Sequence, residues 1–265
     1  MKLMSIASGS SGNCIFVGTD NTSLLVDVGI SKKRIVDGLK TIDMKLEDID
    51  GILITHEHID HVKSLGVIAR KHDIPLYATR ETCDAILDMG SLGKFDSGLL
   101  KPISVDKTFL IGDITINPHS IWHDAADPVC YTFCSDSKKI SVATDMGDFD
   151  DYIVDCLKDS NALLIEANHD IRMLQVGPYP YSLKQRILGK RGHLSNEASG
   201  KLILQLLNSN IKTICLGHLS KDNNYPELAY ETVKNELLGN PYTNDVREFD
   251  LHVENRESFG NLICI

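Results

Sequence analysis

The sequence contains no apolar run long enough to cross a bilayer, no charged start followed by a long apolar core, and no low-complexity tract. Its seven cysteines are scattered and include no C-x-x-C pair, which argues against a zinc finger or a disulfide framework. Such cysteines are typical of reduced thiols that serve as small core residues. We therefore expect a cytoplasmic protein that has no membrane contact.

Positive charge is also scarce, since 27 Lys and Arg residues stand against 37 Asp and Glu residues, a net charge of −10 at pH 7. This balance argues against a surface that coats nucleic acid, although a local groove can be basic when the rest of a protein is acidic. Residues 32–34 form one basic cluster, which we interpret as a solvated face. A second, spread cluster leads into residues 192–196 and comprises Lys184, Arg186, Lys190 and Arg191.

The 265 residues, of which 42% are hydrophobic and 24% charged, can form a full core and are ordinary for an α/β fold. Strand-like runs are predicted at residues 3–7, 14–17, 24–28, 52–54, 76–78, 111–116, 129–133, 140–143, 162–165, 212–216 and 246–253. Helix-like runs are predicted at residues 63–72, 81–89, 152–158, 196–207 and 227–238, and residues 177–181 are expected to form a long loop. This order fits an αββα sandwich, two mixed sheets flanked by helices. No linker or fixed repeat interrupts it, so residues 1–265 are expected to form a single domain.

A dense polar motif follows the predicted strand at residues 52–54 and comprises His56, His58, Asp60 and His61. Imidazole and carboxylate together suit a borderline divalent ion such as Zn²⁺, Mn²⁺ or Fe²⁺. The helical zinc-protease pattern H-E-x-x-H does not fit, because Asp60 stands four residues after His56. The motif lies just beyond the end of a strand, where open α/β sheets place their sites.

The spacing within the motif suggests two ions. His56 and His58 are two residues apart and point the same way in extended backbone. Asp60 and His61 come after a further bend and can face a second ion. Apolar residues then recur at helical spacing, so the loop is expected to open onto a helix.

The pattern H-x-H-x-D-H after a buried strand resembles the signature of the metallo-β-lactamase fold, a superfamily of dinuclear metal hydrolases. The resemblance implies three further ligands at later strand ends, and the candidates are His123 (with His119 as the alternative), Asp145 and His218. It implies that one ion is held by His56, His58 and His123, the other by Asp60, His61 and His218, with Asp145 bridging the two. Two such ions can share a hydroxide, lower its pKa and clamp both oxygens of a displacement.

A second motif, Gly-His-Leu-Ser-Asn at residues 192–196, opens the predicted helix with Ser195 or Asn196 as its N-cap. A helix N-terminus beside a histidine is suited to phosphate. With the later strand that ends at His218, this order resembles ribonuclease Z and related phosphodiesterases. The resemblance implies that His193 assists the leaving group or binds phosphate, supported by the acidic strand end at residues 164–169. His193 as a mere polar residue near the helix cap is the alternative.

A further resemblance rests on residues 8–14, 123–125, 192–196 and 217–220, the last followed by Asn223. Together they resemble the WalJ/YycJ family of bacterial metallo-β-lactamase-fold proteins over nearly the whole length. The resemblance implies a 5′→3′ DNA exonuclease that uses a metal-bridging hydroxide and two divalent ions, Mn²⁺ or Zn²⁺, with Fe²⁺ also possible. Asp60 and His193 are then the expected catalytic residues. The expected substrate contacts are Ser10, Ser11, Asn13, His169, Lys190, Arg191 and Asn196.

Two other functions compete with this one. A small-molecule hydrolase of the same fold would act on a cyclic phosphodiester, a lactone or a thioester. A non-catalytic regulatory protein would keep the metals for structure. The His193 motif and the basic stretch before it favour the phosphodiesterase, and the complete ligand set disfavours the regulatory protein. The expected partner is a nucleic acid, in the first place DNA, and the sequence does not indicate an oligomeric state.

Overall fold

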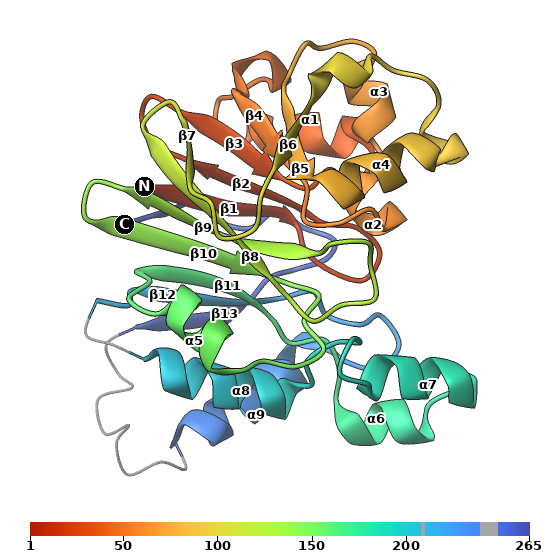
Figure 1. The fold of residues 1–265 in the computed structure, drawn as a ribbon. Coiled ribbons are helices and arrows are strands. Elements are labelled where there is room, and N and C mark those ends of the chain that lie inside the picture. Colours follow the sequence, from red (N-terminus) through yellow and green to blue (C-terminus); the bar gives the residue numbers. More distant parts are fainter. Residues whose placement is uncertain (208–209, 239–248) are drawn as a thin grey trace.

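The computed structural model describes residues 1–207, 210–238 and 249–265, and within them two seven-stranded sheets pack face to face (Figure 1). The first sheet has the order β14-β1-β2-β3-β4-β5-β6, and the second has the order β13-β12-β11-β10-β9-β8-β7. The strands are β1 Lys2–Ala7, β2 Cys14–Gly18, β3 Ser23–Val26, β4 Gly51–Leu53, β5 Leu76–Thr79, β6 Leu100–Ile103, β7 Phe109–Ile111, β8 Ile114–Ser120, β9 Val129–Ser135, β10 Lys138–Ala143, β11 Ala162–Glu166, β12 Thr213–Gly217, β13 Asp250–Val253 and β14 Ile263–Cys264.

Helices cover the outer face of each sheet, so the αββα sandwich predicted from the sequence is confirmed (Figure 1). The first sheet is covered by α1 Lys32–Lys40, α2 Ile59–Val62, α3 Leu65–Ala69 and α4 Arg80–Asp88. The second is covered by α5 Asp151–Leu157, α8 Asn196–Leu206 and α9 Pro226–Leu238, while α6 Ile171–Val176 and α7 Tyr181–Leu188 project to one side. Three short 3-10 turns lie at Leu46–Asp48, Gly90–Leu92 and Ser97–Leu99. None of the helices that the structure describes is long and apolar enough to span a membrane.

The apolar runs of the early strands divide between two cores because successive strand residues point to opposite faces. Ile15 and Leu24 pack with Tyr131 of the second sheet in the core between the sheets. Their neighbours Phe16 and Leu25 belong to the core between the first sheet and its helices. Burial on both faces is the reason that these strands read as nearly continuous apolar runs.

Part of each sheet is parallel, and this arrangement positions the site. Strands β3 to β6 run parallel in the first sheet, and β10 to β13 run parallel in the second. The carboxyl ends of parallel strands meet at one edge of a sheet, which is where such sheets bind their ligands. The two parallel halves bring their carboxyl ends to the same side of the sandwich, the side from which α6 and α7 project (Figure 1).

Several elements differ from the sequence-based expectation. The expected helix at residues 63–72 is two short helices, α2 and α3, and the expected strand at 111–116 is divided by a turn at Gly112, whose φ of 55° favours glycine. Helices α1, α6 and α7 were not expected, and α7 begins at Tyr181 inside the expected loop. Of the expected final strand, residues 250–253 form β13, and residues 246–248 lie outside the described residues.

Candidate metal centre

The predicted metal ligands converge from the carboxyl ends of strands in both sheets. The His56 motif follows β4 of the first sheet, whereas Asp145 follows β10 and His218 follows β12 of the second sheet. Both Asp145 and His218 have a left-handed backbone, with φ of 60° and 54°. The main chain therefore turns sharply as each strand ends, and the side chain is carried into the space between the sheet edges.

The motif after β4 bends as its spacing predicted. His58 is the N-cap of α2, so Asp60 and His61 lie in the first turn of that helix. The ring centroid of His56 lies 4.5 Å from that of His58 and 4.1 Å from that of His61. His56 is fully buried, whereas Asp60 keeps 24% of its side chain exposed. Asp60 and His58 are therefore the members of the motif that are partly exposed to solvent.

The seven predicted ligands form two adjoining groups. In each group the potential ligand atoms lie within 4.8 Å of one another, and the groups are His56, His58 and His123, and Asp60, His61 and His218. Asp145 lies between them, with Oδ2 3.2 Å from His61 Nε2 and Oδ1 3.4 Å from His218 Nε2. Its Oδ1 is also 3.8 Å from His123 Nε2. This is the grouping that the resemblance implied, with Asp145 in the bridging place.

Of the two candidates for the third histidine, the structure brings His123 to the cluster. Its Nε2 lies 3.3 Å from His58 Nδ1. His119 instead packs near Tyr152, with its Nε2 3.0 Å from the hydroxyl of Thr132 and its Nδ1 3.5 Å from Asp106. His119 forms a separate group of potential ligand atoms with Asp106 and Cys156, so it is a poor candidate for either ion.

The outer ring nitrogens of the cluster already have acceptors. The Nδ1–H of His61 donates to Asp27 (2.8 Å), that of His218 to Glu166 (2.8 Å), and that of His123 to the carbonyl of Gly192 (3.1 Å). These contacts fix each tautomer so that Nε2 carries the lone pair and faces inward.

The same arrangement holds for His56 and completes the test of whether these residues fit a metal ion. The hydroxyl of Thr55 donates to Asp27, so it accepts from Nδ1 of His56 at 3.0 Å. The inward Nε2 atoms of His56 and His218 are buried and have no hydrogen-bond partner. Buried polar atoms are rarely left without a partner. The donor set of imidazole nitrogens and carboxylates therefore fits divalent cations.

The protonation of the histidines in the cluster depends on burial and on the nearby carboxylates. Burial, followed by the charge of His61, holds the pKa of His56 well below its usual value, so this ring is neutral, as a ligand must be. Burial would also lower the pKa of His218, but Asp145 and the other carboxylates outweigh it and raise the pKa to about 10. A cation that binds at His218 therefore takes the place of a proton.

Asp27 is a contributor that the sequence analysis missed. Its carboxylate follows β3, is almost fully buried, and accepts hydrogen bonds from His61, from the Thr55 backbone N–H (2.9 Å) and from the Thr55 hydroxyl (2.9 Å). Burial raises its pKa, and the neighbouring charge of His61 opposes that effect. The available signal was an acidic residue directly after an apolar run, the same signal that identified Asp145.

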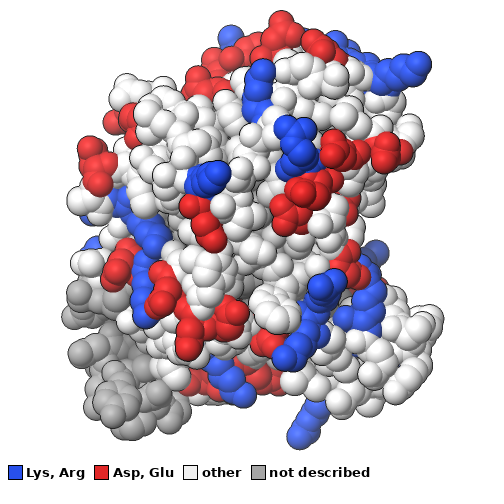
Figure 2. Space-filling view, viewed as in Figure 1, with Lys and Arg blue, Asp and Glu red and all other residues white. Residues whose placement is uncertain are grey.

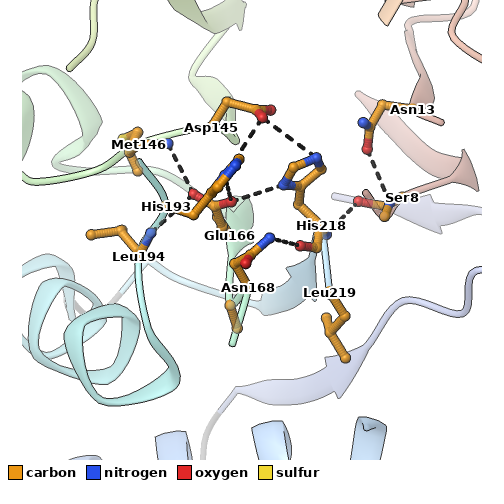
Figure 3. Close-up of polar contacts among 12 residues, drawn as sticks. Ser8, Asn13, Asp145, Met146, Glu166, Asn168, His193, Leu194, His218 and Leu219 are labelled. Carbon is orange, nitrogen blue, oxygen red and sulfur yellow. Dashed lines mark hydrogen bonds and ion pairs between the residues drawn. The ribbon is translucent and has the colours of Figure 1, made fainter. Parts of the chain in front are cut away.

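Glu166, at the end of β11, connects the cluster to His193. Its Oε1 accepts from Nδ1 of both His193 and His218, each at 2.8 Å (Figure 3). Its Oε2 accepts from the backbone N–H groups of Met146 (2.9 Å) and Leu194 (3.3 Å). Burial would raise the pKa of Glu166, but the charge of His193 and the hydrogen bonds from both histidines lower it to about 2. The carboxylate is thus ionised and orients two imidazoles at once.

His193 lies beside the cluster and outside the predicted ligand groups. Its Nδ1 is 3.7 Å from Asp145, and its ring centroid is 5.2 Å from that of His123 and 5.3 Å from that of His218. About 15% of its side chain is exposed. Because Glu166 occupies Nδ1, the Nε2 atom is left to meet a molecule that enters from solvent.

His218 is held by its main chain as well as by its ring. Its N–H donates to the hydroxyl of Ser8 at 2.8 Å, and its carbonyl accepts from the side-chain amide of Asn168 at 2.9 Å (Figure 3). Ser8 follows β1 of the first sheet and His218 follows β12 of the second, so this contact also connects the two sheets. The left-handed backbone of His218 is therefore supported on both sides.

The remaining predicted substrate contacts differ in their access to solvent. Ser10 and Ser11 are exposed in the turn after β1, and Lys190 is exposed as well. Asn13 is buried, with Oδ1 accepting from the Gly9 N–H and Nδ2 3.1 Å from His61 Nε2. His169 is also buried, and neither of its ring nitrogens has a hydrogen-bond partner.

Asn196 is a correction to the sequence-based expectation. Its side chain is fully buried and exchanges hydrogen bonds with Asn224 at 2.8 and 3.1 Å, which argues against the substrate contact expected of it. The N-cap of α8 is Ser195, whose hydroxyl accepts from the N–H of Ala198. The Asn196 N–H donates to the carbonyl of His169, so two N–H groups of this helix start are already used. The start of α8 therefore has fewer free N–H groups to bind a phosphate than we expected.

Comparison with known proteins agrees with this fold and site. Residues 7–218 match the metallo-beta-lactamase superfamily. The chain belongs to that superfamily. It is 44% identical over 236 residues to the exodeoxyribonuclease WalJ of Streptococcus pneumoniae, covering 89% of this chain and 88% of that one. It is 41% identical over 232 residues to the exodeoxyribonuclease YycJ of Bacillus anthracis, covering 88% and 87%. The resemblance to the WalJ/YycJ family is thereby confirmed.

Among solved structures, the crystal structure of Zn²⁺-bound PqqB from Methylobacterium extorquens superposes with a TM-score of 0.73 over 100% of both chains. The identity is 14%, so this likeness concerns the fold alone.

The backbone of Gly29 packs directly against the metal motif and gives a first test of the site. A Cβ built on Gly29 would lie 1.6 Å from the carbonyl oxygen of Asp60. We expect Gly29→Ala to lower the free energy of unfolding by roughly 1–3 kcal/mol, as overpacking does, and to lower the metal content. Urea denaturation and metal analysis of the purified protein measure the two effects. Gly90→Ala is the matched control, because a Cβ there meets nothing within 4 Å. An unchanged metal content in Gly29→Ala would show that the main chain at Asp60 can shift while the ligand side chains stay in place.

Proposed function

We propose that the protein is a 5′→3′ DNA exonuclease that works with two divalent cations, Mn²⁺ or Zn²⁺ in the first place and Fe²⁺ as a further possibility. The observation that carries the proposal is His193, whose Nδ1 is held by Glu166 beside the predicted metal donors Asp145 and His218. The names of the relatives that are 41% and 44% identical to this chain support DNA as the substrate. Since both sheets contribute donors, we also propose that residues 1–265 work as one domain.

Asp60, Glu166 and His193 would each have a separate role in phosphodiester cleavage. Two bound cations supply Lewis acidity and lower the pKa of the attacking water. Asp60, the partly exposed carboxylate of the motif, orients that water. Glu166 holds Nδ1 of His193, so Nε2 can deliver a proton to the leaving oxygen. Charge that develops on the phosphoryl group lies close to the imidazole, where a fixed donor stabilises it best.

Basic side chains close to the metal cluster support a substrate with several phosphates. Lys190 and Arg191 directly precede the His193 motif, and Arg186 of α7 forms a two-point ion pair with Asp124, the neighbour of His123. Across the face shown in Figure 2, acidic and basic side chains are otherwise mixed. A local basic stretch on an acidic protein suits a nuclease that binds a strand end without coating itself in nucleic acid.

Two alternatives fit the observations less well. A hydrolase of a cyclic phosphodiester, a lactone or a thioester needs no basic stretch before His193, and hydrolysis of a lactone or thioester needs no such proton donor. A non-catalytic metal-binding regulatory protein has no need for a solvent-accessible carboxylate and imidazole beside a buried donor set.

The decisive experiment compares substrates on one preparation. Protein loaded with Mn²⁺ or Zn²⁺ is incubated with DNA and RNA strands that carry a 5′-phosphate or a 5′-hydroxyl, and with a lactone and a thioester. We expect stepwise release of mononucleotides from the 5′ end of DNA and its loss after chelation. Hydrolysis of the lactone or thioester without release of nucleotides would overturn the proposal, and preferred cleavage of RNA would correct its substrate.

A further inference from the structure

Trp122, the single tryptophan of the sequence, presents its ring to solvent next to the metal centre. It lies two residues after the end of β8 and is 43% exposed, although it directly precedes the buried ligand candidate His123. Its carbonyl accepts a hydrogen bond from the Gly147 N–H at 2.8 Å, which fixes the main chain at this point. The ring therefore has a defined place without being part of a core.

A hollow of about 340 Å³ lies over this ring. It is lined by Trp122, His123, Ala125, Ala126, Asp127 and Arg191, among other residues. This volume is at the small end of the range for sites that bind small organic ligands. Since His123 belongs both to the hollow and to the metal cluster, a group seated against Trp122 lies on the His123 side of that cluster.

Cationic side chains accompany the ring. The ammonium of Lys190 lies 5.8 Å from the ring centroid of Trp122, a cation–π distance. The Lys190 side chain is 75% exposed, and Asp148, at 3.9 Å, is a distant ion-pair partner. Arg191 lines the same hollow. An aromatic platform flanked by basic side chains is the combination with which proteins bind single-stranded nucleic acid, by stacking bases and tracking phosphates.

We propose that Trp122 stacks on the base of a nucleotide next to the scissile phosphate, and that Lys190 and Arg191 contact the phosphates on either side of it. This inference rests on the proposed nuclease function and specifies its substrate as a single-stranded end whose base has left the duplex. Stacking tolerates every base, so the site binds nucleotides without selecting a sequence.

The first test pairs a protein variant with a substrate variant. In steady-state kinetics on 5′-phosphorylated oligothymidylate, Trp122→Ala should lower kcat/KM by about 5- to 150-fold, the range for loss of one stacked base, and mainly through KM. Trp122→Phe keeps a ring and should recover most of the loss. On oligonucleotides with one abasic residue at the first, second or third position from the 5′ end, the effect of Trp122→Ala should vanish at one position. An equal loss on abasic and intact strands would overturn the proposal.

Controls separate stacking from damage to the site. Tyr230→Ala is the matched variant, because Lys234 lies 5.4 Å over the Tyr230 ring on α9, a helix that contributes no ligand to the cluster. This variant should behave as the wild type does. Trp122→Ala should retain its metal content and its activity on a p-nitrophenyl phosphodiester, a substrate without a nucleobase.

The second test does not depend on cleavage. Because Trp122 is the sole tryptophan, its fluorescence reports this position alone. Oligothymidylate should quench the emission, and the strand with an abasic residue at the sensitive position should quench it much less. Quenching in a protein that cleaves no DNA would refute the proposed function and leave the stacking site standing. Absence of quenching under conditions where binding is seen by anisotropy would refute the stacking site itself.

Discussion

Replacing Asp60 with alanine is expected to abolish turnover on 5′-phosphorylated DNA while the fold persists. Asp60 places its carboxylate 3.5 Å from His61 Nε2 and 3.8 Å from His218 Nε2, and it is the accessible carboxylate of the cluster. Its loss removes a donor of the second ion and the group that orients the attacking water. The decrease should therefore exceed the roughly 10²–10⁴-fold contribution of a single acid–base group. Activity and circular dichroism on the same preparation measure both parts of the prediction.

The fold should survive because the structural contacts of Asp60 come from its main chain. Its carbonyl accepts from the Asn13 N–H at 2.8 Å, and alanine keeps that hydrogen bond. Asp106→Ala is the matched control, a second carboxylate near a histidine, His119, but outside the cluster. It should leave turnover unchanged. Activity retained in Asp60→Ala despite the loss of one ion would show that the other ion is sufficient.

Replacing His193 with alanine should leave both metal groups able to bind their ions yet reduce nuclease kcat by roughly 10²–10⁴-fold, the range for one general acid. Its Nδ1 donates to Glu166, and Glu166 keeps its hydrogen bond from the ligand candidate His218 when His193 is removed. A p-nitrophenyl phosphodiester has a leaving group that needs no proton, so its hydrolysis should change little. The ratio of the two rates, together with metal content, is the measurement.

Two results would contradict that role. An equal loss on both substrates would mean that His193 organises the site and does not donate a proton. Loss of metal would mean that His193 is itself a ligand. Its Nδ1 lies 3.7 Å from Asp145, close enough for both residues to contact one ion. His119→Ala provides the control for removing an imidazole elsewhere, since His119 contacts Thr132 and no ligand group that contains the motif.

The sequence predicted most of the fold and the position of the motif because both depend on local patterns. Buried strands are short apolar runs, and the motif begins three residues after the end of one of them, β4. Helices α1, α6 and α7 were missed because each is short, with at most nine residues and few buried side chains. Two of them begin at a side-chain cap, since Ser31 accepts from the Arg34 N–H at α1 and Asp170 accepts from the Met173 N–H at α6.

Within the site, the residues that were missed or misjudged are those whose role is set by contacts between segments distant in the chain. Asp27 follows β3, and nothing in its local sequence shows that His61 donates to it. Asn196 looked like a polar residue at an open helix start, but Asn224 and His169 occupy its side chain and its N–H. Partners 28 residues away in the chain cannot be recognised from spacing alone.

The left-handed backbone at the strand ends places stability and function in competition. Asp27, Asp145 and His218 have φ of 61°, 60° and 54°, a conformation that costs a non-glycine residue on the order of 1 kcal/mol. Glycine at any of the three positions would relax the main chain, yet it would delete a carboxylate or an imidazole from the centre. Selection for thermal stability alone would therefore favour glycine at these three positions and remove the ligands. A protein that retains its catalytic side chains there has a lower free energy of unfolding than the same fold could reach.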